Sequence, residues 1–360
     1  MVAKNSSTDS PKLEDATQSL IAVESSSTSD PCECVNYYLC PNKTLNTNGE
    51  GIIDVRINDC GSYLEQCCPN GEVKPPPARL PPSPTGCGFR NSKGVGFKIK
   101  GATNGEAEFG EFPWMIAVFH RIALDEKSIP VYQCGGALIH PQVVLTAAHC
   151  VIDKDNLKIR AGEWDTQTKK EQYPFQDRDV ADVMIHPKFQ PGPLFNDIAL
   201  LFLETPVDVA PHIGVVCLPP PDLIVNDSRC FTTGWGKNNF GKEDMYQVIL
   251  KKVDLPVVPS DTCQEYLRNT RLGKYFNLDE SFVCAGGEEG KDACTGDGGS
   301  PLVCPIEGYP EKYVQVGIVA WGIGCGHLMI PGVYVNVNLF RRWIDEELTS
   351  RNFDISVYQY

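Results

Sequence analysis

Three stretches of the sequence carry residue types that could act together on a carbonyl group. His149 lies in LTAAHC, Asp197 lies at the start of the apolar run NDIALLFL, and residues 292–304 read DACTGDGGSPLVC. A histidine oriented by a carboxylate can take the proton of a serine hydroxyl, and the activated oxygen can then attack a carbonyl carbon. The glycine-rich stretch contains Ser300, so acyl transfer is the first chemistry to consider.

These stretches, in this order, resemble those of the chymotrypsin-like serine proteases. The phrases GEFPWMIAV, CGGALI, CLP, TTGWG, VAWG and PGVY support the resemblance, which covers residues 101–345. It implies an all-β fold, a chymotrypsin-like double β-barrel with a C-terminal helix, in which His149 is the general base and Asp197 orients it. Short apolar strands between Gly and Pro turns also predict a barrel or sandwich. FRRWIDEELTS, at 340–350, has helical spacing.

The resemblance places Gly298 where the family has its nucleophilic serine. Glycine offers no hydroxyl, and loss of the nucleophile of such a triad lowers turnover by about 10⁶-fold. Ser300 follows two residues later, which puts it roughly 5–7 Å away along the chain, whereas a hydroxyl must lie about 2.6–3.2 Å from the imidazole. Because the residues on both sides of Gly298 keep the family spacing, we expect that Ser300 does not replace the missing serine.

Two further positions depart from the pattern of the active proteases. GATN at 101–104 stands where the family has an Ile-Val-Gly-Gly terminus that inserts beside Asp297, and its glycine cannot anchor such a terminus. Ala320, before Trp321, replaces a serine that usually supports Asp197. The three differences together predict a natural loss of catalysis, and they leave Asp297 in need of another partner.

Two other features of the active family are retained in part. Asp292 matches the floor of a trypsin-like specificity pocket, with Gly322 and Gly332 at its walls, so this remnant could hold Arg or Lys. The alternative is an inherited carboxylate that water and backbone groups satisfy. GEWDTQTKKEQ, with Glu163 and Glu171, is similar to the calcium loop of some trypsins but about two residues shorter. Calcium is therefore a candidate ligand, and no cofactor is required.

The cysteines indicate a secreted protein. The chain has 16 of them, six between residues 32 and 68, and disulfides are formed mainly in oxidising compartments. The pattern C-x-C-x5-C…C-x6-C-C resembles the clip domain of arthropod serine proteases and of their non-catalytic homologues. The two resemblances imply the pairs Cys32–Cys67, Cys34–Cys60, Cys40–Cys68, Cys87–Cys217, Cys134–Cys150, Cys230–Cys304, Cys263–Cys284 and Cys294–Cys325. The sequons at Asn5, Asn42 and Asn226 fit glycosylation.

The composition divides the chain into five parts. We expect a flexible N-terminal tail at 1–31, rich in Ser and Thr, and a clip domain at 32–68. A proline-rich linker at 69–100, which Cys87 would tether, precedes the serine-protease-like domain at 101–345. A C-terminal tail at 346–360 completes the chain.

The chain combines a clip domain with a protease-like domain that has glycine in place of the catalytic serine. In this it resembles the non-catalytic clip-domain homologues that act in haemolymph cascades. The resemblance implies a binding cofactor that helps to activate prophenoloxidase in melanisation and innate immunity. It also implies cleavage by an upstream clip-domain serine protease. Arg56–Ile57, in GEGIIDVRINDCG, suits such a cut, although an ordinary strand arginine is the alternative. A cut there would free a strand edge and favour a homo-oligomer.

The partner-binding surface of the clip domain is expected among its apolar residues, about half of which we expect to form its own small core. They are Val35, Tyr37, Tyr38, Leu39, Ile52, Ile53 and Val55. The net charge of −14 argues against nucleic acid or an anionic membrane as partner. Two other functions stay open: an active trypsin-like clip-domain protease of the same cascade, and a protein that recognises microbial polysaccharide.

Overall fold

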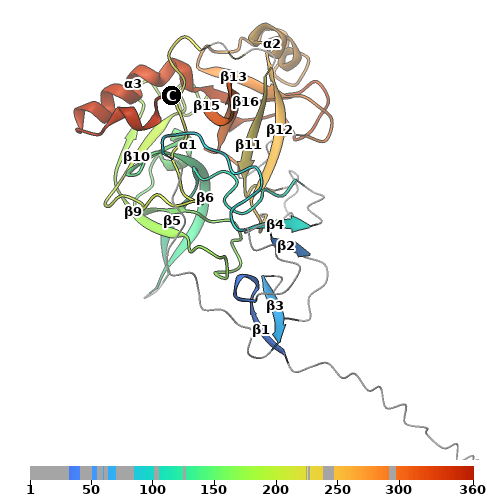
Figure 1. Cartoon of the computed structure of the whole chain (residues 1–360). Helices are drawn as coiled ribbons and strands as arrows, with labels where there is room; N and C mark the ends of the chain where they lie inside the picture. Colours follow the sequence, from blue (N-terminus) through green and yellow to red (C-terminus); the bar gives the residue numbers. More distant parts are fainter. Residues whose placement is uncertain are drawn as a thin grey trace, which may run out of the picture.

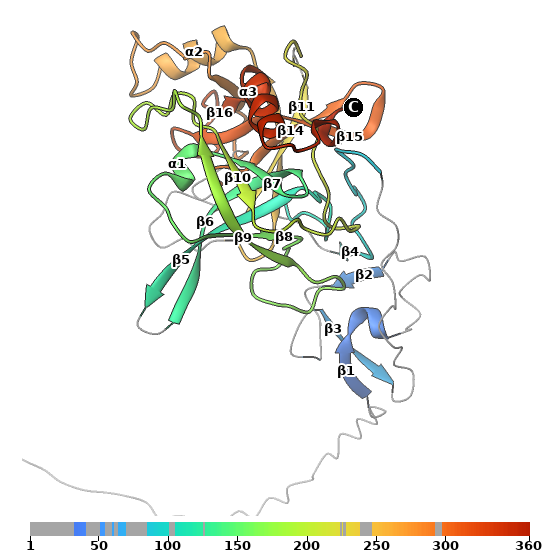
Figure 2. The same cartoon turned by 90° about the vertical axis from the view of Figure 1, so that its left-hand side faces the viewer.

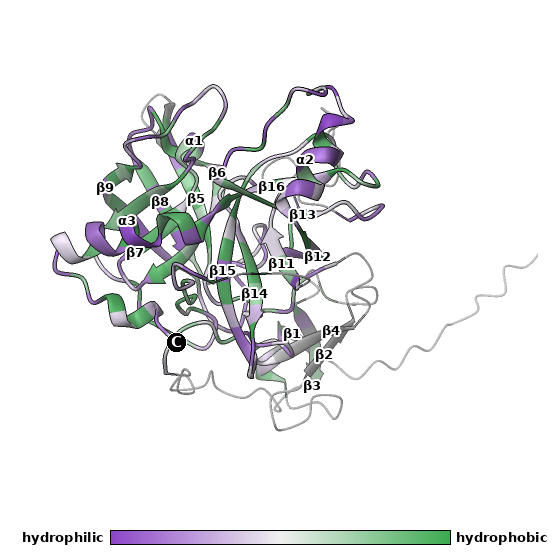
Figure 3. Ribbon diagram, turned by 90° about the horizontal axis from the view of Figure 1, so that it is seen from above, coloured by the Kyte–Doolittle hydropathy of each residue, from purple (hydrophilic) through white to green (hydrophobic). Residues whose placement is uncertain are grey.

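The computed structural model describes residues 32–40, 51–54, 60, 64–69, 85–100, 105–124, 127–223, 225, 228–237, 247–291 and 297–360. Two closed barrels of six antiparallel strands form the main body, and two small two-stranded sheets lie beside it (Figure 1). Hydrophobic residues concentrate on the strands of the barrels, whereas hydrophilic residues concentrate on the loops and helix faces (Figure 3). The predicted all-β double barrel with a C-terminal helix is confirmed.

The first barrel has the strand order β10-β7-β6-β5-β8-β9. Its strands are β5 (Met115–Leu124), β6 (Lys127–His140), β7 (Val143–Thr146), β8 (Leu157–Ala161), β9 (Gln176–Ile185) and β10 (Ala199–Leu203). In β8, LKIRA, buried and half-buried residues alternate, because successive side chains of a strand point to opposite faces. The apolar strand β10, ALLFL, is buried along its whole length.

The second barrel has the order β11-β12-β13-β16-β15-β14. Its strands are β11 (Arg229–Gly234), β12 (Lys251–Val258), β13 (Phe282–Gly286), β14 (Pro301–Ile306), β15 (Tyr309–Trp321) and β16 (Pro331–Asn336). Helix α2 (Ser260–Arg268) is joined to β13 by the Cys263–Cys284 disulfide. The short helix α1 (Ala148–Val151) follows β7 in the first barrel.

The C-terminal segment is packed against the barrels. Helix α3 (Val337–Ser350) begins three residues before the predicted helix and buries an amphipathic stripe with helical spacing: Val337, Phe340, Arg341, Ile344 and Leu348. It is followed by the 3-10 helix η2 (Ile355–Tyr358). Residues 346–360, expected as a tail, therefore include ordered structure, because Tyr358 is fully buried and its hydroxyl donates to Asp345 Oδ1 at 2.7 Å.

The segment before the first barrel is anchored by a buried ionic cluster. The Arg90 Nε–H donates to Glu111 Oε1 at 3.0 Å, and Lys252 Nζ donates to Glu111 Oε2 at 2.7 Å. Glu111 is fully buried. The guanidinium of Arg90 also lies 4.1 Å from the ring centroid of Phe231 and donates to the hydroxyl of Tyr313 at 2.9 Å. One carboxylate therefore links the incoming chain to strand β12 of the second barrel.

The clip region forms its own antiparallel pair of strands, β1 (Cys32–Asn36) and β3 (Glu65–Pro69), with the 3-10 helix η1 (Tyr37–Leu39) after β1. It is attached to the first barrel by an ion pair between Lys170 Nζ and Glu65 Oε1, 2.7 Å apart. Leu64 is fully buried and belongs to the hydrophobic core of the barrels. A third clip strand, β2 (Gly51–Asp54), pairs in parallel with β4 (Phe97–Lys100).

Seven disulfides connect described residues, and all are pairs that the resemblance implies. They are Cys32–Cys67, Cys34–Cys60, Cys40–Cys68, Cys87–Cys217, Cys134–Cys150, Cys230–Cys304 and Cys263–Cys284. Cys325 is also disulfide-bonded, and its expected partner Cys294 lies outside the described residues. Because Cys87 is bonded to Cys217, the linker stays covalently attached to the body of the molecule even if the chain is cut between the two.

Candidate functional site

His149 and Asp197 form a closely coupled pair. The imidazole Nδ1–H donates to Asp197 Oδ2 at 2.6 Å, and the backbone N–H of His149 donates to Asp197 Oδ1 at 2.7 Å. The aspartate is fully buried, whereas 28% of the histidine side chain is exposed. Both carboxylate oxygens are therefore used by the histidine, which fixes the ring with Nε2 pointing away from Asp197, as a general base requires. The serine replaced by Ala320 is not needed for this arrangement.

Gly298 lies opposite Nε2 of His149, the ring nitrogen that does not contact Asp197. A Cβ atom placed on Gly298 would lie 2.8 Å from Nε2 and 3.4 Å from Cε1. The imidazole thus occupies part of the space that a side chain at residue 298 would need. The loop is otherwise held in place, because the N–H of Gly135 donates to the Gly298 carbonyl at 2.9 Å. The structure therefore places the base of a triad against a residue that cannot supply a nucleophile.

The neighbouring Gly299 fixes the shape of this loop. Its φ is +78°, a value that residues with a Cβ rarely adopt. A Cβ there would also lie 2.4 Å from Thr146 Oγ1 and 2.5 Å from the carbonyl oxygen of Gly135. Both the backbone angle and the lack of space therefore require glycine.

Ser300 is buried next to glycines of both barrels. It is fully buried, and its hydroxyl lies 2.0 Å from the position of a Cβ on Gly135 and 3.2 Å from that of one on Gly234. Within the described part of the chain, this hydroxyl has no hydrogen-bond partner. Ser300 therefore fills a space between Gly135 of the first barrel and Gly234 of the second barrel.

Asp297 has a hydrogen-bond partner in the second barrel. Its Oδ1 accepts a hydrogen bond from the backbone N–H of Gly236 at 2.8 Å. A Cβ on Gly236 would lie 2.5 Å from this oxygen, and one on Gly234 would lie 2.1 Å from it, so the carboxylate packs against both glycines. Gly236 was not predicted as this partner, although the two glycines of TTGWG were a signal for such a close approach. The 101–104 stretch lies outside the described residues.

The sequence matches known protein families. Residues 103–344 match the family model named Trypsin, and residues 22–69 match the model named Serine protease Clip domain PPAF-2. Phenoloxidase-activating factor 2 of Galleria mellonella is 56% identical over 298 residues, which cover 81% of this chain and 98% of that protein. The chain belongs to the clip-domain serine protease homologues.

Two other relatives of this homologue carry names that describe them as inactive. The protein called Inactive CLIP domain-containing serine protease A28 of Anopheles gambiae is 38% identical over 358 residues, covering 90% of this chain and 92% of that protein. The one called Inactive CLIP domain-containing serine protease A8, also of Anopheles gambiae, is 39% identical over 321 residues, covering 87% of each. Among the described residues of the homologue, no helix is long and apolar enough to cross a membrane.

The remnant of the specificity pocket is only partly described. Asp292 lies outside the described residues. Gly332 lies in β16, in register with Ala285 of β13. Gly322 directly follows β15, and a Cβ there would lie 3.6 Å from the carbonyl oxygen of Gly324, its nearest neighbour among the described residues away from the adjoining chain. A basic ligand in this pocket therefore stays a prediction.

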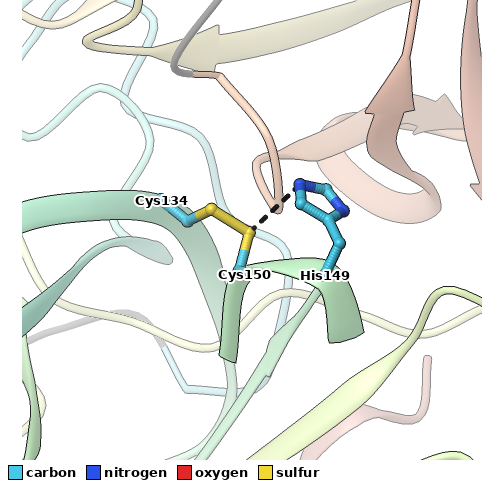
Figure 4. A group of neighbouring side chains, drawn as sticks. All are labelled: Cys134, His149 and Cys150. Carbon is cyan, nitrogen blue, oxygen red and sulfur yellow. Dashed lines mark hydrogen bonds between the residues drawn. A yellow bond between two sulfur atoms is a disulfide. The ribbon is translucent and has the colours of Figure 1, made fainter. Parts of the chain in front are cut away.

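His149 and two neighbouring cysteines form a group of potential metal ligands, but the cysteines are bonded to each other and cannot bind a metal. Cys134, His149 and Cys150 lie together, with Cys150 Sγ 3.5 Å from His149 Nε2 (Figure 4). The two sulfurs are bonded to each other. A disulfide has no thiolate, which is the form of cysteine that binds metals. The group is therefore a disulfide packed against the histidine.

Three buried carboxylates lie on the loop that resembles a calcium loop. Burial raises the pKa of Glu163, Asp165 and Glu171. The pKa of Glu171 rises to about 7, and the carboxylates of Glu163 and Asp165 act in the same direction through charge repulsion. Arg160 offsets part of this negative charge, since its Nη1–H donates to Glu163 Oε2 at 2.8 Å.

The raised pKa of Glu171 predicts that the homologue is less stable at alkaline pH than at acidic pH. The pKa of Glu171 is about 7 in the folded protein, against 4.5 for the unperturbed group, so the folded state holds an extra proton between these values. The free energy of unfolding therefore falls as the pH rises from 4.5 through 7. In a chelator, Glu171→Gln should stabilise the protein by about 3 kcal/mol at pH 8 and by about 1 kcal/mol at pH 5. Urea titrations at both pH values measure this, and an equal effect at both would contradict it.

The apolar residues of the clip domain have divided roles. Val35, predicted as a partner-binding residue, is instead buried in the clip core with Cys40 and Cys68, and Leu39 packs against this core. Val35 therefore belongs to the part of this set that was expected to form the small core of the clip domain, and the partner-binding surface stays a prediction. Tyr38 packs against the core of the barrels.

Several predicted positions belong to the part of the chain that is not described. Val55, Arg56, Ile57 and the sequons at Asn5, Asn42 and Asn226 lie outside the described residues, as do the side chains of Tyr37, Ile52 and Ile53.

Proposed function

We propose that this homologue is a secreted, catalytically inactive protein that acts by binding, as a cofactor in the activation of prophenoloxidase. One observation supports inactivity above all others: the oriented imidazole of His149 faces Gly298, which has no hydroxyl. The cascade is suggested by the 56% identity to a protein named Phenoloxidase-activating factor 2. A reconstituted assay tests the proposal by adding the homologue to purified, processed prophenoloxidase. Oxidase activity should rise although the homologue cuts no bond.

In this proposal, the cofactor becomes active when an upstream clip-domain protease cuts between Arg56 and Ile57. Arg56→Gln removes the side chain that a trypsin-like protease recognises. The variant should stay uncut and support oxidase activity only at the background level of the assay. Arg56→Lys is the matched control, because it keeps the positive charge and should still be cut. If the glutamine variant were processed and active like the native protein, this switch would be wrong.

Calcium binding at Glu163 and Glu171 is proposed as a structural aid. Calcium prefers carboxylate oxygens, and a divalent cation would relieve the repulsion that contributes to the raised pKa of Glu171. Arg160 already occupies one side of Glu163, so the cation would be held mainly from the Glu171 side. Calcium should raise the midpoint of thermal unfolding of the native protein at pH 8 and leave that of Glu171→Gln unchanged. Magnesium at the same concentration is the control.

A further inference from the structure

The loop that follows α2, residues 269–278, displays basic side chains on an acidic protein. Residues 266–278 read YLRNTRLGKYFNL, with three basic residues and no acidic one, whereas the whole chain has a net charge of −14. Arg268 at the end of α2 is paired, since its Nη1–H donates to Glu265 Oε1 at 2.7 Å. Arg271 and Lys274 are both exposed, and within the described part of the chain neither has an acidic partner. Two cations of the α2 loop are therefore available to an anionic ligand.

Tyr275 adds an aromatic ring beside these cations. Its exposed fraction is 83%, the largest among the exposed large hydrophobic side chains of the described residues. Lys274 Nζ lies 5.0 Å from the centroid of this ring. Tyrosine and arginine are the residue types on which the binding energy of protein interfaces most often depends. The combination of Arg271 and Tyr275 is therefore typical of a surface that binds another protein.

The α2 loop is held in a fixed shape although its tip is exposed. Arg268 Nε–H donates to the Phe276 carbonyl at 2.8 Å. Two successive turns are closed by backbone bonds, from the N–H of Gly273 to the Thr270 carbonyl and from the N–H of Phe276 to the Gly273 carbonyl. The ring of Phe276 packs edge-on against Trp321, with the centroids 6.2 Å apart. A preformed loop loses little conformational entropy on binding, so more of its contact energy contributes to affinity.

The acidic residues that follow in the sequence lie beyond the base of the α2 loop. The N–H of Leu278 donates to Gln264 Oε1 at 2.9 Å, which returns the chain to α2. Asp279 and Glu280 come after this contact and lead into β13. The exposed tip, residues 271–275, therefore carries positive charge and no negative charge.

The α2 loop is far from the clip strands. In two views at right angles, α2 lies at one end of the molecule and the clip strands β1 and β3 lie at the other (Figures 1 and 2). A partner held at the α2 loop would therefore not compete with a partner held by the clip domain.

The charge of the whole protein narrows the kind of partner. An acidic segment is repelled by the net charge of −14 and attracted by unpaired cations, so it approaches the α2 loop in a defined orientation. An anionic polysaccharide is the other ligand of this charge. Such polymers are bound by runs of five or more basic residues, whereas two unpaired cations and an aromatic ring stand here. The observations thus favour a protein segment.

We propose that the α2 loop is a docking site for an acidic segment of a partner protein. Arg271 and Lys274 pair with its carboxylates, and Tyr275 packs against an apolar side chain between them. This inference rests on the proposed function in one respect, namely that the homologue acts by binding.

A labelled peptide of aspartates around two central leucines is the probe, and fluorescence anisotropy on the full chain measures its binding in about 50 mM salt. Arg271→Glu combined with Lys274→Glu should weaken binding at least about tenfold, and Tyr275→Ala should do the same, as is usual for residues that dominate an interface. Lys93→Glu combined with Lys188→Glu is the matched control, because both lysines are exposed and the net charge changes equally. This control should retain most of the binding.

Three results would overturn the docking site. Equal losses in the two double variants would show a response to net charge alone. Displacement of the peptide by heparin, together with full binding by Tyr275→Ala, would assign the loop to an anionic polysaccharide. Failure of the native protein to bind the peptide at this salt concentration would also reject the proposal. Urea midpoints equal to that of the native protein verify that each variant is folded.

Oxidase activity, measured with the same variants, separates this inference from the proposed function. If the native protein binds the peptide through the α2 loop but does not raise the activity of processed prophenoloxidase, the cofactor role alone is rejected. If the native protein raises oxidase activity and the loop variants bind the peptide as the native protein does, the docking site alone is rejected.

Discussion

Replacing Glu111 by alanine should lower the free energy of unfolding by about 3–5 kcal/mol, the usual cost of removing one partner of a buried ion pair. The carboxylate is fully buried and accepts hydrogen bonds from two cationic side chains, Arg90 and Lys252. Without it, two positive charges would be left close together with little access to water. The loss should appear in urea-induced unfolding followed by tryptophan fluorescence.

An exposed ion pair provides the control for Glu111. Glu346 accepts from Arg342 Nε at 2.8 Å, but both side chains are largely exposed. Pairs of this kind contribute roughly 0.2–1 kcal/mol, so Glu346→Ala should have little effect. Similar losses for Glu111→Ala and Glu346→Ala would show that the cluster at Arg90 does not hold the incoming segment.

The second large effect concerns catalysis. The turnover number of the native protein should be about 10⁶-fold below that of a protease with a complete triad. Restoring serine in Gly298→Ser should not restore this activity. In Gly298→Ser the new Cβ would lie 2.8 Å from His149 Nε2, so the imidazole must move from its present position. Asp297 accepts from the N–H of Gly236, and Gly101, which stands where the family has the first residue of the inserted terminus, has no side chain to anchor such a terminus.

Gly298→Ala is the matched control for this experiment, because it adds the same Cβ without a hydroxyl. Hydrolysis of an arginine ester and the burst from an active-site titrant measure both variants. We expect no burst from the native protein and no difference between the serine and alanine variants. A stoichiometric burst from the native protein would establish the alternative function, an active trypsin-like protease.

The sequence predicted those features of the molecule that a short sequence motif defines by itself. The words LTAAHC and NDIALLFL located both members of the His149–Asp197 pair, and cysteine spacing together with the family resemblance named the seven described disulfides. The short apolar strands predicted a barrel or sandwich, because a strand has two distinct faces, and the family resemblance implied the two barrels.

Contacts between segments far apart in the chain could not be predicted in this way. Nothing in FKIK identifies the clip strand as its partner, because a four-residue strand carries too little pattern to choose among edges. Glu111 is one of three glutamates in GEAEFGEF, and nothing in this stretch singles it out for burial between Arg90 and Lys252. The burial of Tyr358 likewise follows from its bond to Asp345 rather than from any periodicity.

The packing of the chain's last residues has a practical consequence for labelling. The backbone N–H of Leu218 donates to the Tyr358 carbonyl at 3.0 Å, and the Gln359 carbonyl oxygen lies 3.4 Å from Cys87 Sγ. An affinity tag or fluorophore fused directly after Tyr360 would crowd the Cys87–Cys217 bond. A spacer of glycine and serine between Tyr360 and the label should leave this corner undisturbed, because such linkers behave as flexible coils.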